Sequence, residues 1–134
     1  SDALIMSAAV ADAKVANYSE EKIRKESLNR VDLAKNPDIL KSLSNNKKSN
    51  QIIFGFAAET SEDLELLEEN GRAKLASKSL DLIYVNNVSN GAVFGSDFTQ
   101  GLIIDRNMNV IKVPEISKDT LSDILLDQLV SKLG

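Results

Sequence analysis

The chain contains neither cysteine nor histidine among its 134 residues. Their absence excludes disulfide bonds, thiolate nucleophiles, imidazole bases and the usual zinc sites. A chain without cysteine also suits the reducing cytoplasm, which is the location that we expect for this protein.

Long apolar runs are missing as well. No run approaches the roughly 20 residues that a membrane-spanning helix needs, and no basic segment precedes Leu4, so we expect neither a membrane span nor a signal peptide. The net charge of −4 argues against general nucleic-acid binding. The chain also lacks a glycine-rich dinucleotide motif and a P-loop lysine motif, which disfavours a conventional dinucleotide-dependent oxidoreductase.

The remaining composition is that of one globular domain with a sizeable core, since 43% of the residues are hydrophobic and 27% are charged. The chain begins Ser1-Asp2-Ala3 and enters a buried-type strand at once, and its first methionine is Met6. We interpret this start as that of a segment taken from a longer protein.

Strands alternate with helices along the chain. Apolar runs predict buried strands at residues 4–10, 51–58 and 81–88, a short strand at 31–34 and a hairpin that joins 102–105 to 110–113. Helices are predicted after Asn36, with Pro37 at the first helical position, over residues 61–79 with a cap at Thr60, and after the cap Ser117. Residues 13–27 read as a loop. The order indicates an α/β domain with a mostly parallel sheet and a late antiparallel hairpin.

Small residues close the first predicted strand. Ser7, Ala8 and Ala9 leave main-chain groups open to a ligand, although small residues also serve simply to pack a strand against a helix. Asp12 follows, as either a loop cap or a ligand group, and a cationic cluster that includes Lys22 comes ten residues later. Such a cluster is either a solvated charge run or a clamp that neutralises a triphosphate.

Three further parts of the sequence each have a structural and a functional interpretation. Residues 36–40 cap a helix, and a helix N-terminus also offers free N–H groups to a nucleotide. Phe56, at a strand end, is most often a core residue. Lys74 and Lys78 share one helix face, and their default environment is solvent.

Taken together, these stretches are similar to a known family. The segments Ser7-Ala-Ala-Val-Ala-Asp12, Glu21-Lys-Ile-Arg-Lys25, Asn36-Pro-Asp-Ile-Leu40 and Gly55-Phe-Ala-Ala-Glu-Thr60 occur in order, followed by Lys74 with Lys78, Asp81-Leu-Ile and Phe94-Gly-Ser-Asp97. This series resembles the synthetase domain of the bacterial phosphopantothenoylcysteine decarboxylase/phosphopantothenate–cysteine ligases. The resemblance covers residues 1–134 as the C-terminal portion of that domain, whose N-terminal part the chain lacks.

The resemblance implies a three-layer, Rossmann-like α/β fold and a ligase of coenzyme A biosynthesis. The implied reaction joins 4′-phosphopantothenate to L-cysteine through an acyl-cytidylate, with CTP as co-substrate, Mg²⁺ as cofactor and CMP and pyrophosphate as products. FMN is expected only in a fused decarboxylase domain outside this chain. The family also implies a homodimer, and we expect the hairpin at residues 102–113 to be the edge for pairing.

Site residues follow from the same resemblance, position by position. Lys22 is implied as the catalytic cation, and Ala9 as a contact of the phosphopantothenoyl group. The residues implied to bind the nucleotide are Met6, Ser7, Ala8, Asp12, Lys22, Pro37, Asp38, Ile39, Leu40, Phe56, Lys74 and Lys78. Asn86, Asn87 and residues 94–97 are interpreted as turn residues.

Some alternatives stay open at this point. The family usually has an aromatic residue and an arginine where this chain has Ala13 and Lys14, so the choice between CTP and ATP is open. A different class of function, a non-catalytic α/β nucleotide-binding or assembly module, would make the lysines surface residues only. A flavin- or NAD-binding domain is the third hypothesis.

Overall fold

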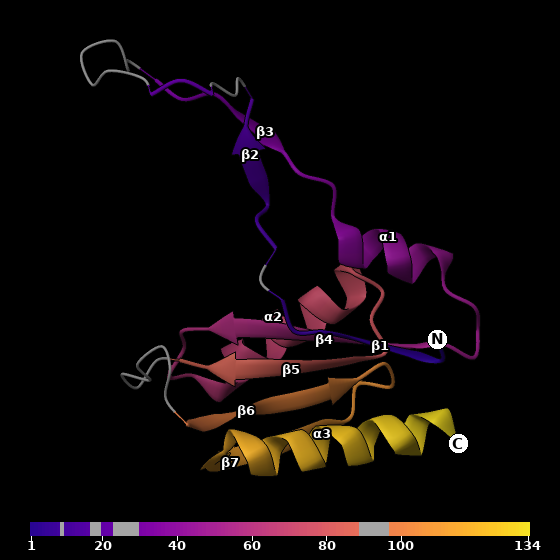
Figure 1. Ribbon diagram of the computed structural model, residues 1–134. Helices are drawn as coiled ribbons and strands as arrows, with labels where there is room; N and C mark the ends of the chain where they lie inside the picture. The colour runs from indigo at the N-terminus through magenta and orange to yellow at the C-terminus, as the bar shows by residue number, and fades with distance from the viewer. Residues whose placement is uncertain (9, 17–19, 23–29, 89–96) are drawn as a thin grey trace.

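The computed structural model describes residues 1–8, 10–16, 20–22, 30–88 and 97–134 (Figure 1). In this part of the chain a five-stranded sheet has the strand order β1-β4-β5-β6-β7. Its strands are β1 (Ala3–Met6), β4 (Ile52–Glu59), β5 (Leu82–Asn87), β6 (Phe98–Asp105) and β7 (Val110–Ser117). β1, β4 and β5 are parallel, and β6 is antiparallel to both of its neighbours. All the strands of this sheet except β6 therefore point the same way, as predicted.

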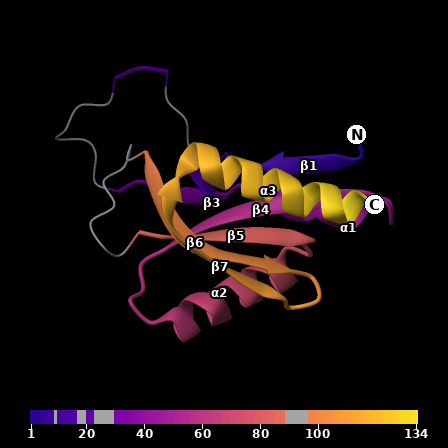
Figure 2. The ribbon, with the colours of Figure 1, turned by 90° about the horizontal axis from the view of Figure 1, so that it is seen from below.

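Helices cover both faces of the sheet. α2 (Leu64–Ser77) lies on one face, with α1 (Ile39–Asn46) beside it, and α3 (Lys118–Leu133) lies on the other (Figures 1 and 2). Within the described residues this is the three-layer arrangement that the resemblance implied. None of the helices in that part of the chain has the length and apolar character that crossing a membrane requires.

Each face of the sheet has its own hydrophobic core. Ile83 and Val85 of β5 pack with Leu67 and Leu75 of α2. The alternate residues Leu82 and Tyr84 face the other way and pack with Leu121 and Leu125 of α3. Successive strand residues point to opposite faces, so a strand buried on both faces must be apolar throughout. This confirms the reading of the β5 run as a buried strand.

Gly71 shows how closely α2 lies on the sheet. A Cβ atom at this position would come within 2.6 Å of Val85 Cγ2 and 2.7 Å of Ile104 Cδ1. The absence of a side chain at Gly71 therefore lets the helix pack directly against β5 and β6.

A second, two-stranded sheet forms an arm that projects from the main sheet (Figure 1). β2 (Ala13–Val15) pairs antiparallel with β3 (Leu33–Lys35). At the base of the arm, the Asn36 backbone N–H donates to the Asp12 carbonyl oxygen at 2.8 Å, and Asn36 Nδ2 donates to the Ala11 carbonyl oxygen at 2.8 Å. The prediction of a loop from residue 13 onward is therefore wrong for β2. The side chains of β2 are exposed on both faces, so they carry no apolar alternation that would reveal a strand.

Several predicted boundaries were also wrong. β1 ends at Met6 instead of residue 10, and it is an edge strand in which Ile5 is 43% exposed. The cap of α1 is Asp38 instead of Asn36, because the Asp38 carboxylate accepts the Lys41 backbone N–H at 3.0 Å while the Asn36 amide is engaged with the arm. Pro37 consequently lies before the helix.

The later elements differ mainly in length. α2 is capped by Asp63, which accepts the Glu65 backbone N–H at 2.9 Å, so the helix starts after the predicted residue 61. The β6–β7 hairpin extends beyond both predicted strands and contains an irregularity between Thr99 and Gly101. Ser117 caps α3 as predicted, accepting the Thr120 backbone N–H at 3.1 Å.

Candidate functional site

The carboxyl end of β1 meets the middle of β4, the base of the arm and the start of α1, and a pocket of about 350 Å³ opens there. We call it the arm-side pocket. Its lining residues are Met6, Ala8, Val10, Ala11, Asp12, Lys35, Asn36, Pro37, Asp38, Ile39, Leu40, Phe56 and Lys78. Ligands of open α/β sheets characteristically bind at this edge, beyond the carboxyl ends of the strands.

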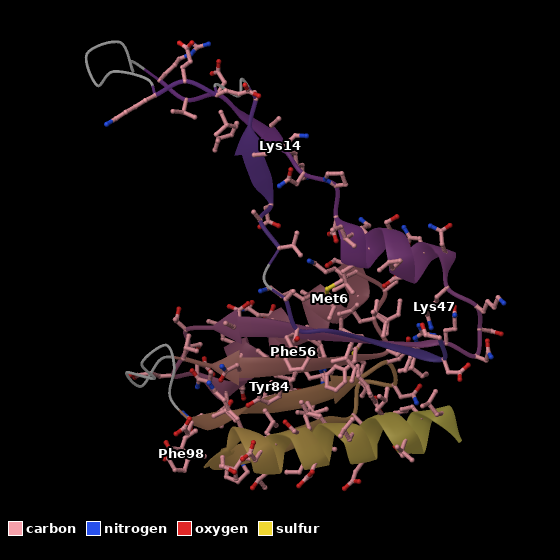
Figure 3. The ribbon with its side chains drawn as sticks, in the orientation of Figure 1. Met6, Lys14, Lys47, Phe56, Tyr84 and Phe98 are labelled. Atoms are coloured by element: carbon pink, nitrogen blue, oxygen red, sulfur yellow. The ribbon has the colours of Figure 1, made fainter. Side chains whose placement is uncertain are left out.

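Phe56 links the sheet to the pocket. Its ring stacks on Phe54 with centroids 5.1 Å apart and meets Tyr84 edge-on at 6.2 Å, yet 37% of the residue is exposed (Figure 3). Phe54 is fully buried and anchors the stack. Phe56 therefore packs on the core with one part of its ring and exposes the rest to the pocket, so it is available both as a core residue and as a ligand contact.

A cation and an anion meet at the mouth of this pocket. Lys78, the C-cap of α2, lies 3.7 Å from the carboxylate of Asp38, the N-cap of α1. The hydrogen bond from the Lys41 backbone N–H is the largest influence on Asp38 and lowers its pKa. Burial opposes this effect, and the charge of Lys78 adds a further, smaller lowering. Asp38 is thus ionised near neutral pH and holds the lysine ammonium near the α1 N-terminus.

Most of the sequence-predicted site residues line this pocket. Those that do are Met6, Ala8, Asp12, Pro37, Asp38, Ile39, Leu40, Phe56 and Lys78. They come from separate stretches of the chain, and the parallel pairing of β1 with β4 brings the first of these stretches beside Phe56. Lys78 joins them because the end of α2 lies beside the start of α1, where its ammonium group is 3.7 Å from the Asp38 carboxylate.

The other predicted residues lie elsewhere. Ser7 lines a neighbouring pocket that is described below. Lys74 forms an ion pair with Glu59 at 2.7 Å and is not part of the arm-side lining. Lys22 is exposed and is also absent from that lining. Ala9, expected to contact the phosphopantothenoyl group, lies outside the described residues, as do Arg24 and Lys25 of the cationic cluster.

A second pocket, of about 600 Å³, adjoins the first on the α3 side of the sheet. We call it the helix-side pocket. Its lining residues are Ser7, Ala8, Phe56, Ala57, Ala58, Tyr84, Asn86, Thr99, Lys118, Leu121, Ser122 and Leu125. The two pockets share Ala8 and Phe56, so ligands bound in them would meet at the end of β1 and the surface of Phe56.

Three polar side chains of the helix-side pocket form a connected network. The Tyr84 hydroxyl lies 2.7 Å from Thr99 Oγ1, and Thr99 Oγ1 donates to Asn86 Oδ1 at 3.1 Å. Sequence reasoning missed this network and took Asn86 for a turn residue. No local signal marks it, because Thr99 lies 13 positions beyond Asn86 and reaches it only through the antiparallel pairing of β5 with β6. Asn36 also lines the arm-side pocket, although the resemblance did not place it among the site residues.

The carboxylates of the site offer few ligands to a metal ion. Among the described residues, no group of three or more acidic side chains is close enough to hold one. Asp12 and Asp38 line the arm-side pocket, and Mg²⁺ in nucleotide sites is typically held by one or two carboxylates, water and the phosphates of the substrate. The pocket therefore suits an ion that arrives with a nucleotide.

Comparisons with known proteins identify the family to which the chain belongs. The chain is 38% identical over 133 residues to the coenzyme A biosynthesis bifunctional protein CoaBC of Bacillus subtilis, covering 98% of this chain and 32% of that protein. It is 36% identical over 125 residues to the CoaBC protein of Borreliella burgdorferi, covering 92% of this chain and 30% of that one. The crystal structure of the C-terminal domain of a CoaBC protein superposes with a TM-score of 0.72 at 29% identity, covering 98% of this chain and 57% of that structure.

The chain thus spans about a third of the length of these two curated relatives. A family model described as the DNA/pantothenate metabolism flavoprotein C-terminal domain matches residues 1–133. With nearly every residue matched by that model, the chain belongs to the DNA/pantothenate metabolism flavoprotein C-terminal domain family.

Proposed function

We propose that this chain is the nucleotide-binding portion of a phosphopantothenate–cysteine ligase of coenzyme A biosynthesis. In the proposed reaction a carboxylate oxygen of 4′-phosphopantothenate attacks the α-phosphorus of CTP, and pyrophosphate leaves. The amine of L-cysteine then attacks the acyl carbon of the acyl-cytidylate, CMP leaves and the amine gives up a proton. Neither step needs a nucleophile from the protein, which suits a chain without cysteine or histidine.

The observation that carries the proposal is the convergence in the arm-side pocket. Nine residues that the family resemblance singles out for nucleotide contact line one pocket at the carboxyl end of β1. The relatives named above, whose names place them in coenzyme A biosynthesis, support the choice of reaction.

The proposed roles follow from the chemistry of the lining. Residues 37–40 and the main chain at Met6 and Ala8 hold the base and ribose, since a helix start and a strand end both offer free backbone groups. Lys78 neutralises phosphate charge, and Lys74 and Lys22 do so once the nucleotide draws them in from the surface. Their contribution is positioning and electrostatic stabilisation of the leaving pyrophosphate, with Mg²⁺ bound to the phosphates of CTP as part of the substrate.

The remaining parts of the proposal concern the longer protein. We expect the chain to work as a homodimer within a longer parent, as the C-terminal portion of its synthetase domain. We also expect the chain alone to be inactive in the complete reaction, because the resemblance places essential groups in the part before it. Turnover of 4′-phosphopantothenate, CTP and L-cysteine by the isolated chain would contradict this.

Lys22→Gln in the parent protein tests the catalytic role, with Lys48→Gln as the matched control. Lys48 is exposed and lies before β4, at the opposite end of the strands from the pocket. We expect Lys22→Gln to lower kcat for ligation by at least about tenfold while Lys48→Gln leaves it unchanged. Equal activity of the two variants would contradict the role of Lys22. A parent without ligation activity would instead favour the non-catalytic nucleotide-binding or assembly module.

A further inference from the structure

The network of Tyr84, Thr99 and Asn86 has a defined direction. Thr99 has one hydroxyl proton, and it donates that proton to Asn86 Oδ1 at 3.1 Å. The 2.7 Å contact between the Tyr84 hydroxyl and Thr99 Oγ1 must then be donated by Tyr84. The Tyr84 phenol therefore donates a hydrogen bond to Thr99, and Thr99 in turn donates one to the Asn86 amide oxygen.

The two hydroxyl-bearing residues are held in place by burial. Tyr84 is 2% exposed and Thr99 is 6% exposed, and the Tyr84 ring also packs edge-on against Phe56 (Figure 3). Burial is the larger influence on the Tyr84 phenol and raises its pKa. The phenol consequently keeps its proton near neutral pH, as a donor must.

Asn86 is the member of the network at the edge of the pocket. It is half-buried, and it lines the helix-side pocket together with Lys118 and Ser122 of α3. With its amide oxygen engaged by Thr99, the orientation of the side chain is set, and the amide nitrogen remains as a donor of two hydrogen bonds. Such a donor, beside an ammonium group and a hydroxyl, suits an acid with several oxygen atoms.

We propose that Tyr84 and Thr99 are positioning residues that hold the Asn86 side chain with its NH₂ group toward the helix-side pocket, as a hydrogen-bond donor to an oxygen of the acid substrate. This inference rests on the proposed function. In that function CTP binds in the arm-side pocket, and the adjoining helix-side pocket is available to 4′-phosphopantothenate, the acid that reacts with CTP. The shared surface at Ala8 and Phe56 is where the two ligands would meet.

The first part of the test uses the free chain and needs no ligand. Nuclear magnetic resonance relaxation of the Asn86 side-chain ¹⁵N reports how firmly the amide is held. We expect it to be as ordered as the backbone in the native chain, mobile in Thr99→Val and ordered again in Thr99→Ser, which restores the hydroxyl. An amide that stays equally ordered in Thr99→Val would overturn the positioning role.

The second part measures ligation by the parent protein. We expect Thr99→Val and Tyr84→Phe to lower kcat/KM for 4′-phosphopantothenate by about 3- to 10-fold, the usual effect of losing one hydrogen bond, with KM for CTP unchanged. Thr99→Ser should recover most of the loss. The control is Thr60→Val, at an exposed threonine outside both pocket linings. Variants that lose thermal stability but keep native kinetics would show that the network is only structural.

The two parts separate failure of this inference from failure of the proposed function. If the native parent does not ligate, the proposed function is wrong, and the inference about the substrate falls with it. If the native parent ligates but Thr99→Val changes neither amide order nor kcat/KM, the proposed function stands and the positioning role is wrong.

Discussion

At the scale of single residues, the arm-side pocket depends on the pairing of Lys78 with Asp38. The ion pair joins the end of α2 to the start of α1 at 3.7 Å, and both side chains are only partly buried. An exposed pair of this kind contributes little to stability. In the proposed function, its importance lies in placing an ammonium group at the pocket, where that group attracts phosphate.

Lys78→Gln should therefore weaken binding of Mg·CTP without unfolding the chain. Loss of one charge-assisted contact to phosphate corresponds to about a tenfold rise in Kd, measurable by calorimetric titration. Lys48→Gln, which removes the same charge at the opposite edge, should leave Kd unchanged. An unchanged Kd in Lys78→Gln would show that this lysine does not contact the nucleotide.

Gly71 carries a residue-scale prediction about packing. Alanine has the higher intrinsic helix propensity by about 1 kcal/mol, so a Gly71→Ala change in an open helix would stabilise it. Here the added methyl group would press on Val85 and Ile104, and we expect a net loss of about 1–3 kcal/mol in the free energy of unfolding. Denaturant titration measures this directly, and a gain in stability would mean that α2 and the sheet move apart easily.

At the scale of elements, two buried carboxylates lie at the edge of the sheet where β4 and β5 begin and β6 ends, away from the pocket. Asp81 accepts the Ile53 backbone N–H at 2.8 Å and forms ion pairs with Lys47 and Arg106. Asp105 accepts hydrogen bonds from Asn109 in the β6–β7 turn and from Lys132 in the last turn of α3. These contacts join the turns and helices to the edge of the sheet opposite the site.

Asp105 makes stability depend on pH. Burial alone would raise its pKa, but hydrogen bonds from Lys132 and Asn109 outweigh that effect and lower the pKa from the ordinary 3.8 to about 2. Because the folded-state pKa is depressed, the stabilisation is complete above about pH 4 and disappears as the pH falls to about 2. Its size is about 2 kcal/mol.

Asp105→Asn tests this element-scale account. We expect the native chain to lose part of its free energy of unfolding between about pH 4 and pH 2, and the variant, which is less stable at neutral pH, to lose less over that range. Denaturant titrations at several pH values give both curves. Parallel curves for the two proteins would show that another group accounts for the acid sensitivity.

At the scale of the whole molecule, the alternation of apolar strands and helices was enough to predict the layered α/β architecture. The run Leu82-Ile83-Tyr84-Val85 is buried on both faces, and a short apolar run between polar segments is typical of such a strand. The short strand predicted at residues 31–34 overlaps β3, whereas β2 escaped prediction because it is held by backbone pairing, with its side chains exposed. No apolar period can reveal a strand of that kind.

Only those residues of the candidate site that belong to the family motifs could be predicted from the sequence. Spacing alone could not show that Asp12, Asp38 and Phe56 meet, because this depends on which strands are neighbours in the sheet. The Tyr84–Thr99–Asn86 network lies outside those motifs and depends on the β5–β6 register. Its discovery required the structure.

The most direct test of the whole account is a titration of the isotope-labelled chain with Mg·CTP, with Mg·ATP for comparison, followed through the backbone amide resonances. We expect shifts concentrated at Met6, Ala8 and Asp12, at residues 38–40, and at Phe56 and Lys78, with smaller effects of ATP. Shifts confined to other surfaces, or none at millimolar CTP, would contradict the assignment of the arm-side pocket as the nucleotide site.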